Sequence, residues 1–325
     1  MKTRRIVLVL LALTAGQALA APTYPCYHPT VTPVIDGEVA GDPAWQSLPA
    51  VTGFSVLGDG YSYTKQTLAR LCWTVEGLYI GVLCEEPDAK LLKPKVLDGG
   101  DTWAEDGIEI FLQPAGRPEV YQFAVTAGGA RGGFEGNPDT TKMRAAAKIG
   151  EDTYSLEALI PFDVVRGRAA EGVKWTGNLC RNIFTTRSGG DKFTSWAPLK
   201  ARFLEPENFA AIVFHDSSLS TAEVEKVTEQ LNSPYRRTLL KQVSQAAKAF
   251  SEYRQGLELA AQDAEYAGRA AALLSDWRRL EEMSRQANRA SILDMRAALV
   301  KLEALNRDSY EVKYDYLIHK LLEEN

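Results

Sequence analysis

Trp103 and Glu109 lie six residues apart, and their side chains together suit the recognition of a sugar. Apolar residues alternate with other types through Ile108–Leu112, which is the period of a β-strand, and Pro114 ends the pattern. An aromatic plane packs against the C–H face of a sugar ring, and a carboxylate accepts bonds from its hydroxyls. The sequence therefore predicts a binding surface at the start of this strand.

Further carboxylates precede the same strand and allow two other chemistries. Asp98, Asp101, Glu105 and Asp106 form an oxygen-rich turn of the kind that a structural calcium ion needs. Glu105 and Asp106, taken with Glu109, also allow a glycoside hydrolase, in which two carboxylates stand about 5 to 9.5 Å apart. Solvated turn residues are the simpler interpretation, and three histidines do not form the cluster typical of catalytic zinc.

The first twenty residues have the pattern of a secretory signal peptide. Basic residues are followed by the apolar run Ile6–Leu13 and by Ala18-Leu19-Ala20, which predicts cleavage after Ala20. The apolar run is too short to span a bilayer, and no later run approaches the roughly 18 residues that a spanning helix needs. We expect a secreted or periplasmic protein without a transmembrane segment.

Charge and cysteine content narrow the class further. The net charge is −5 before the basic leader is removed, which disfavours a nucleic-acid or anionic-membrane partner. Export permits disulfides among Cys26, Cys72, Cys84 and Cys180, and three connectivities remain open. A hairpin that pairs residues 75 and 78 points Cys72 and Cys84 to opposite faces, which argues against that bridge.

Composition divides the mature chain near Ser217. Only two of 25 glycines and one of 15 prolines lie beyond it. The region 21–217 contains many short β-patterned segments separated by turn residues, which predicts an antiparallel β-sandwich. The expected strands are Val31–Ile35, Val51–Val56, Thr67–Trp73, Leu78–Cys84, Ile108–Leu112, Val120–Thr126, Met143–Ile149, Thr153–Leu159, Lys174–Phe184 and Phe209–Phe214.

An ordered set of short motifs resembles family 9 carbohydrate-binding modules and their relatives, including DOMON-type sandwiches. The motifs are Val34-Ile35-Asp36-Gly37, Asp42-Pro43-Ala44-Trp45, Gly77-Leu78-Tyr79-Ile80-Gly81, Asp106-Gly107-Ile108-Glu109-Ile110-Phe111-Leu112, Tyr121-Gln122-Phe123, Glu157-Ala158-Leu159-Ile160-Pro161-Phe162, Arg181-Asn182 and Ser195-Trp196-Ala197-Pro198. The resemblance implies a non-catalytic sandwich that holds a sugar between aromatic rings, in some members with structural calcium.

Trp103 and Glu109 match the strand of the family that includes a stacking aromatic residue. We expect Trp103 to stack on a pyranose and Glu109 to accept hydroxyl bonds, with Trp196 as a second ring and Arg131 and Asn182 as further contacts. Trp45 and Trp73 are expected in the core. Relatives of the sandwich also hold haem through Met and His or Lys, which makes Met143 with Lys142 or Lys148 an alternative.

The region 218–325 is predicted to be helical. Ser220 and Glu223 form a capping box, and Asn232-Ser233-Pro234 is expected to end one short helix and begin another. Apolar residues from Leu239 to Leu274 then recur every seven residues, which predicts one helix of about 50 residues, near 75 Å long. Two later stretches, separated at Asp308-Ser309, are expected to fold back on it as a helical hairpin or coiled coil.

The sequence thus predicts an exported, non-catalytic protein that binds oligo- or polysaccharide and carries no cofactor, with structural calcium as an option. The C-terminal helices would provide a homo-oligomer contact or a protein partner site. The alternatives are a structural or interaction protein of the cell envelope, a haem-binding sandwich and a glycoside hydrolase.

Overall fold

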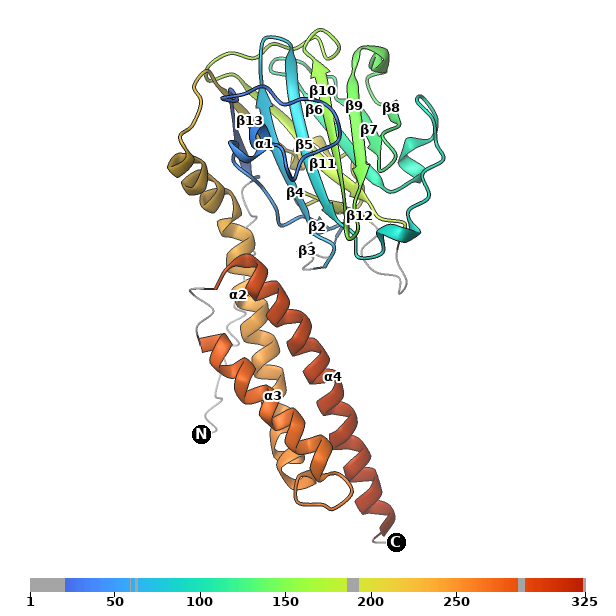
Figure 1. Cartoon of the computed structure of the whole chain (residues 1–325), viewed down its shortest axis with the longest axis vertical. Helices are drawn as coiled ribbons and strands as arrows, with labels where there is room; N and C mark the ends of the chain where they lie inside the picture. The colour runs from blue at the N-terminus through green and yellow to red at the C-terminus, as the bar shows by residue number, and fades with distance from the viewer. Residues whose placement is uncertain (1–20, 59, 62–63, 186–192, 286–289, 324–325) are drawn as a thin grey trace, which may run out of the picture.

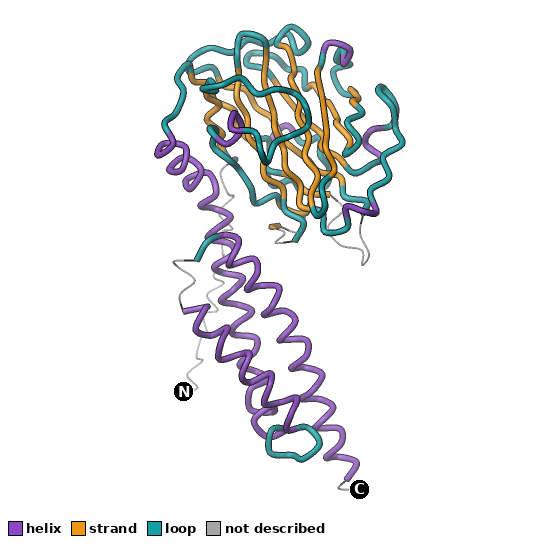
Figure 2. The backbone as a smooth tube through the Cα atoms, viewed as in Figure 1, coloured by secondary structure: helices purple, strands orange, loops and turns teal. Residues whose placement is uncertain are grey.

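The computed structural model describes residues 21–58, 60–61, 64–185, 193–285 and 290–323. A β-sandwich formed by the N-terminal part carries a bundle of long helices that projects from one end (Figure 1). Strands and helices are cleanly separated along the chain, as Figure 2 shows. This arrangement confirms the predicted class, a mainly β region followed by an all-α region. The expected signal peptide, residues 1–20, lies outside the described residues.

The first sheet of the sandwich carries the predicted binding surface. All of its pairings are antiparallel. Its strands, in spatial order, are β8 (Arg131–Gly133), β7 (Tyr121–Thr126), β6 (Gly107–Gln113), β11 (Lys174–Asn182), β12 (Phe193–Ser195), β2 (Ser55–Val56) and β3 (Gly60–Tyr61).

The second sheet branches from the first at β11, whose early residues pair with β13 and whose late residues pair with β12. Strand β1 lies parallel to both of its neighbours, and the remaining pairs are antiparallel. The strands, in order, are β13 (Ala210–His215), β1 (Thr23–Tyr27), β4 (Thr67–Trp73), β5 (Gly77–Glu85), β10 (Thr153–Pro161) and β9 (Arg144–Ile149).

The main core lies between the two sheets and takes alternate residues from each strand. Trp73 and Trp175 are buried there, at 6% and 1% exposure. Trp45 lies on the outer side of the second sheet, where its ring covers Gly81 and its Nε1 donates to Glu157 Oε1. A Cβ at position 81 would stand 2.7 Å from that ring. The core prediction is confirmed for Trp45 and Trp73.

Most predicted strands are present with ends shifted by one or two residues. Val31–Ile35 is wrong because this segment is loop, and only Ser55–Val56 of the predicted Val51–Val56 forms a strand. The sequence pattern did not indicate β1, β3, β8 or β12. The short helices are α1 (Pro43–Gln46) and the 3-10 turns η1 (Ala89–Leu91), η2 (Thr102–Ala104), η3 (Thr140–Lys142) and η4 (Pro206–Asn208).

The β4–β5 hairpin is displaced by two residues from the expected register. Cys72 pairs with Tyr79, and Cys84 pairs with Thr67. Since a two-residue shift preserves which face each side chain takes, Cys72 packs on the outer side and Cys84 in the main core. The argument against a Cys72–Cys84 bridge is therefore confirmed, and all four cysteines are buried as free thiols.

The helical region contains α2 (Thr221–Ala260), α3 (Ala267–Arg285) and α4 (Ile292–Glu323), packed around a core of their own. The Glu223 carboxylate accepts from Ser220 N and Oγ, which confirms the helix start. Pro234 is interior to α2 rather than a boundary, and Asp308-Ser309 is interior to α4.

No 50-residue helix forms. The chain turns after Ala260, where Tyr266 is buried at 8% exposure against Tyr316 and His319 of α4. These contacts override a heptad pattern that runs through the turn.

Specific contacts join the helices to the sandwich. Asn232 of α2 accepts from Thr52 N at 2.8 Å and donates to Ala50 O at 2.9 Å. Arg296 of α4 forms a two-pronged ion pair with Glu85 of β5, at 2.8 and 2.5 Å. In the part of the chain that the structure describes, no helix combines the length and the apolar character needed to cross a membrane.

Candidate functional site

Glu109 is held by two amides on the outer face of the first sheet. Its neighbours Ile108 and Ile110 point into the core, so strand alternation turns Glu109 outward. Asn182 Nδ2 donates to its Oε1 at 2.8 Å, and Gln122 Nε2 donates to its Oε2 at 2.6 Å. We call Glu109, Gln122 and Asn182 the polar cluster. Its members come from the adjacent strands β6, β7 and β11.

The turn η2 crosses this outer face and presents Trp103. Gly132 of β8 makes room for it, since a Cβ there would stand 2.3 Å from Thr102 Oγ1. Asn182 Nδ2 also donates to Trp103 O at 3.2 Å, so the two hydrogens of one amide hold both Glu109 and the Trp103 backbone. The Trp103 side chain remains 51% exposed.

Two further exposed aromatic rings adjoin Asn182. Phe193 is its direct partner across the β11–β12 pair, and Phe184 follows it by two residues. Phe184 and Phe193 are 45% and 39% exposed, and their rings meet edge to face at 6.2 Å between centroids. Trp103, Phe184 and Phe193 thus give the polar cluster an apolar border, of which the sequence analysis identified only the tryptophan.

Burial changes the acidity of the central carboxyl. Glu109 is 6% exposed, and this desolvation raises its pKa, while the bonds from Asn182 and Gln122 act in the opposite direction. A carboxylate has about four acceptor positions, and the two amides occupy two of them. The arrangement supplies acceptor capacity beside an aromatic surface.

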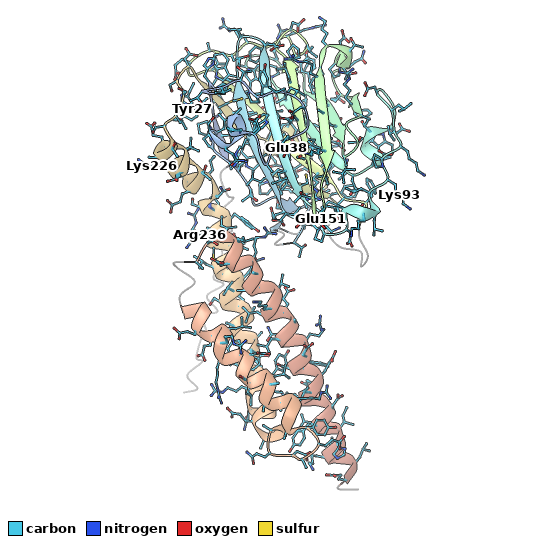
Figure 3. All side chains as sticks on the ribbon, viewed as in Figure 1. Tyr27, Glu38, Lys93, Glu151, Lys226 and Arg236 are labelled. Carbon is cyan, nitrogen blue, oxygen red and sulfur yellow. The ribbon has the colours of Figure 1, made fainter. Side chains whose placement is uncertain are left out.

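A pocket of about 410 Å³ adjoins the site. Phe184, Ala104 and Asp106 line one part of it, and Lys93 and Lys95 line another. Lys93 is labelled in Figure 3 at the edge of the sandwich. Because Ala104 directly follows Trp103 and Phe184 also borders Asn182, the pocket extends the same surface with charged groups.

Of the predicted binding residues, the structure brings together Trp103, Glu109 and Asn182. Trp196 is 4% exposed and packs against Tyr24 in the main core, so the prediction that it stacks on a ligand is corrected. Arg131 pairs with the core residue Val125, which turns its side chain away from the polar cluster; it bonds Asp98 and Met143 O instead.

Gln122 and the two phenylalanines were missed as site residues. The only signal for Gln122 was a polar residue between two aromatic ones, and its relation to Glu109 depends on the hairpin register. Phe184 shares the parity of Asn182 and could have been found from it.

The acidic turn before β6 is held by N–H donors. Glu105 Oε1 accepts from Lys95 N and Val96 N, and Asp106 accepts from Phe184 N and from Thr185. Asp98 pairs with Arg131, and Asp101 is exposed. Within the described ranges, no three His, Cys, Asp or Glu side chains gather as a metal site would require. Calcium therefore stays a prediction without a ligand set here.

The same engagement bears on the two chemical alternatives. Glu105 and Asp106 are bound to backbone amides, and Glu109 is bound to side-chain amides, which is not the paired acid and base of a glycoside hydrolase. Met143 is fully buried in the core. Lys142 and Lys148 are on the surface, paired with Asp163 and Glu38. The residues proposed for haem ligation are thus not brought together.

No family model matches this sequence, and no curated protein matches it. Solved structures do show similarity over 60% of the chain. One, described as a candidate carbohydrate-binding protein from Bacteroides uniformis, is 16% identical and covered in full, with a TM-score of 0.49. Two others are a family 9 carbohydrate-binding module from Caldicellulosiruptor kristjanssonii, in complex with cellotriose or with glucose. Each is 18% identical with a TM-score of 0.46, and 95% and 98% of those chains are covered.

Proposed function

We propose that this protein is a non-catalytic carbohydrate-binding protein that recognises an oligo- or polysaccharide on the outer face of the first sheet. The observation that carries the proposal is the half-exposed indole of Trp103, whose backbone is held by the same Asn182 amide that binds the buried Glu109 carboxylate. A rigidly held aromatic plane beside a carboxylate matches the two faces of a sugar, one apolar and one rich in hydroxyls.

Each residue has a defined role in this proposal. Trp103 stacks on a pyranose, and Phe184 and Phe193 extend the apolar surface to neighbouring sugar units. Glu109 accepts a hydroxyl bond at a position that the amides leave open, and the partly exposed Gln122 lies at the rim. Asn182 is almost fully buried, so it positions the other groups rather than covering the ligand itself.

The expected affinity is modest. A stacking contact and a hydrogen bond each contribute about 1 kcal/mol net. Immobilising the ligand costs about 4 kcal/mol or more. A few such contacts give a dissociation constant between micromolar and millimolar, which suits a protein that attaches to a polymer at many positions.

Retention on insoluble glycans tests the function directly. The full chain is incubated with cellulose, xylan and chitin, and a glycan array identifies soluble oligosaccharides that bind. Retention on at least one polymer is the expected result, and absence of binding throughout both assays counts against the proposal.

A second candidate function is self-association through the end of α4. Tyr310, Tyr314, Leu317 and Leu321 are exposed there and recur at intervals of four and three residues. This is the spacing of a coiled-coil seam, which pairs with a helix of the same pattern, so the partner we propose is a second copy of the chain. Light scattering of the full chain measures it.

Export is part of the proposal, since the sequence of residues 1–20 carries a leader pattern. The protein would act in the periplasm or outside the cell, where glycans are accessible. N-terminal sequencing of protein recovered from an expressing cell is expected to begin at Ala21, and recovery of an intact Met1 terminus would contradict it.

A further inference from the structure

A pocket of about 450 Å³ lies at the opposite ends of β6 and β11 from the polar cluster. It lies between the β6–β7 loop and the segment that precedes β11. Three arginines and no acidic residue are among its lining side chains: Arg117, Arg166 and Arg168. We call it the arginine pocket. Such a concentration of positive charge stands out in a chain whose net charge is −5.

The backbone around the arginine pocket is fixed. Arg117 Nε donates to Arg166 O at 3.1 Å, which ties the two loops together. Trp175 Nε1, deep in the core, donates to Arg168 O at 3.1 Å. Gly167 lies against the same indole, where a Cβ would stand 2.4 Å from Trp175 Cζ2. The main chain that carries Arg166 and Arg168 is therefore anchored to a buried tryptophan.

Arg166 itself has a left-handed backbone, with φ of 48°. This conformation is uncommon for a residue other than glycine, and it costs about 1 kcal/mol or more unless the surroundings require it. It places an arginine, rather than a glycine or asparagine, at the tip of the turn.

The acids nearest in sequence are engaged elsewhere. Asp163 pairs with Lys142 at 2.7 Å. Glu171 accepts from Asp216 N at 2.8 Å and contacts His215 Nδ1 at 3.0 Å. Within the described part of the chain, no carboxylate pairs with Arg117, Arg166 or Arg168. Most of the guanidinium donors of these three side chains thus face solvent at the pocket.

We propose that the arginine pocket binds a small organic acid of about sugar size through its oxyanion, a carboxylate or a phosphate. Guanidinium groups form two parallel bonds to such anions, and several around one cavity increase both affinity and selectivity for charge. The volume falls within the range of small-molecule sites and exceeds what a single inorganic anion fills.

The arginine pocket is independent of the saccharide site. Strand β6 separates them by seven residues, about 20 Å at 3.3 Å per residue. A ligand in one site leaves the other open, so failure of one proposal does not decide the other.

Titration calorimetry of the full chain at low salt tests the proposal with glucuronate, glucose 6-phosphate, glucose and inorganic phosphate. The test variant is Arg166→Asn with Arg168→Gln, since asparagine tolerates the left-handed backbone. The matched control, Arg278→Gln with Arg279→Gln, removes the same charge from exposed positions on α3. Melting curves verify that both variants fold, and Arg168→Gln alone replaces the test variant if it does not.

We expect glucuronate or glucose 6-phosphate to bind with a dissociation constant that increases with salt. The test variant is expected to weaken that binding at least tenfold, while the control and Trp103→Ala leave it unchanged. Three results would overturn the proposal: neither organic acid binds, the arginine variants bind as wild type does, or inorganic phosphate binds as tightly as the two organic acids.

Discussion

Asn182 Nδ2 donates to Glu109 Oε1 at 2.8 Å across 73 residues of sequence. Through its second hydrogen the same amide holds Trp103 O, so one side chain sets the position of both the carboxylate and the aromatic plane. The geometry of the proposed site therefore depends on a residue that is itself buried.

Replacing Asn182 with alanine should damage both stability and binding. Glu109 loses one of its two amide donors while remaining buried, and an unsatisfied buried group costs about 1 to 3 kcal/mol. Chemical denaturation should show that loss, and calorimetry should show weaker saccharide binding because Trp103 is no longer held. A variant with native stability and native affinity would mean that Asn182 does not position the site.

The pH dependence of stability should carry a signature of Glu109. Since burial raises its pKa, the folded protein binds a proton at pH values where the unfolded chain has released it. The stability that this proton provides is fully present below the ordinary glutamate pKa, about 4.3, and is lost as pH rises through the higher folded value.

Melting curves of wild type and Glu109→Gln between pH 4 and 7 isolate this contribution, since buried Glu157, whose pKa is also raised, is common to both. We expect wild type to lose more stability than the variant as pH rises through this interval. Parallel curves for the two proteins would contradict the pKa direction.

The contact between α2 and the sandwich should be specific. Asn232→Ala removes bonds to Thr52 N and Ala50 O, and we expect a loss of about 1 to 3 kcal/mol in denaturation. Arg237→Ala, an exposed change on the same helix, is the control and should alter stability by less than about 0.5 kcal/mol. Equal effects of the two substitutions would indicate that the helices do not depend on this contact.

The exposed end of α4 should control oligomeric state. Replacing both Leu317 and Leu321 with lysine places charge in the proposed seam and should shift the full chain toward monomer in light scattering. The fold should persist, because both side chains are exposed already. A wild-type protein that is monomeric at all accessible concentrations would refute self-association.

Sequence reasoning was most successful where a pattern is local. Alternation located β6 and its outward carboxylate, and Ser220 with Glu223 located the start of α2. It failed where distant contacts decide the outcome. Trp196 occurs in a turn-rich segment that suggested exposure, yet Tyr24 of β1, a strand with no clear pattern, packs against it in the core.

The partners of Glu109 show the same limit. Which residues of β7 and β11 lie beside it depends on strand register, and register is set by both faces of the sheet at once. Pro234 was taken as a boundary because proline usually interrupts a helix, but the packing of α2 on the sandwich and on α4 maintains the helix through it.

The most direct test of the account compares Trp103→Ala with Tyr310→Ala. The two side chains are equally exposed, at 51% and 52%, but Tyr310 lies on α4. Calorimetry uses the soluble oligosaccharide of whichever polymer retains the wild type, which removes effects of multivalent attachment. The account predicts that Trp103→Ala weakens binding roughly tenfold, about 1.4 kcal/mol, with little change in stability, while Tyr310→Ala binds as wild type does. Unchanged affinity in Trp103→Ala would contradict it.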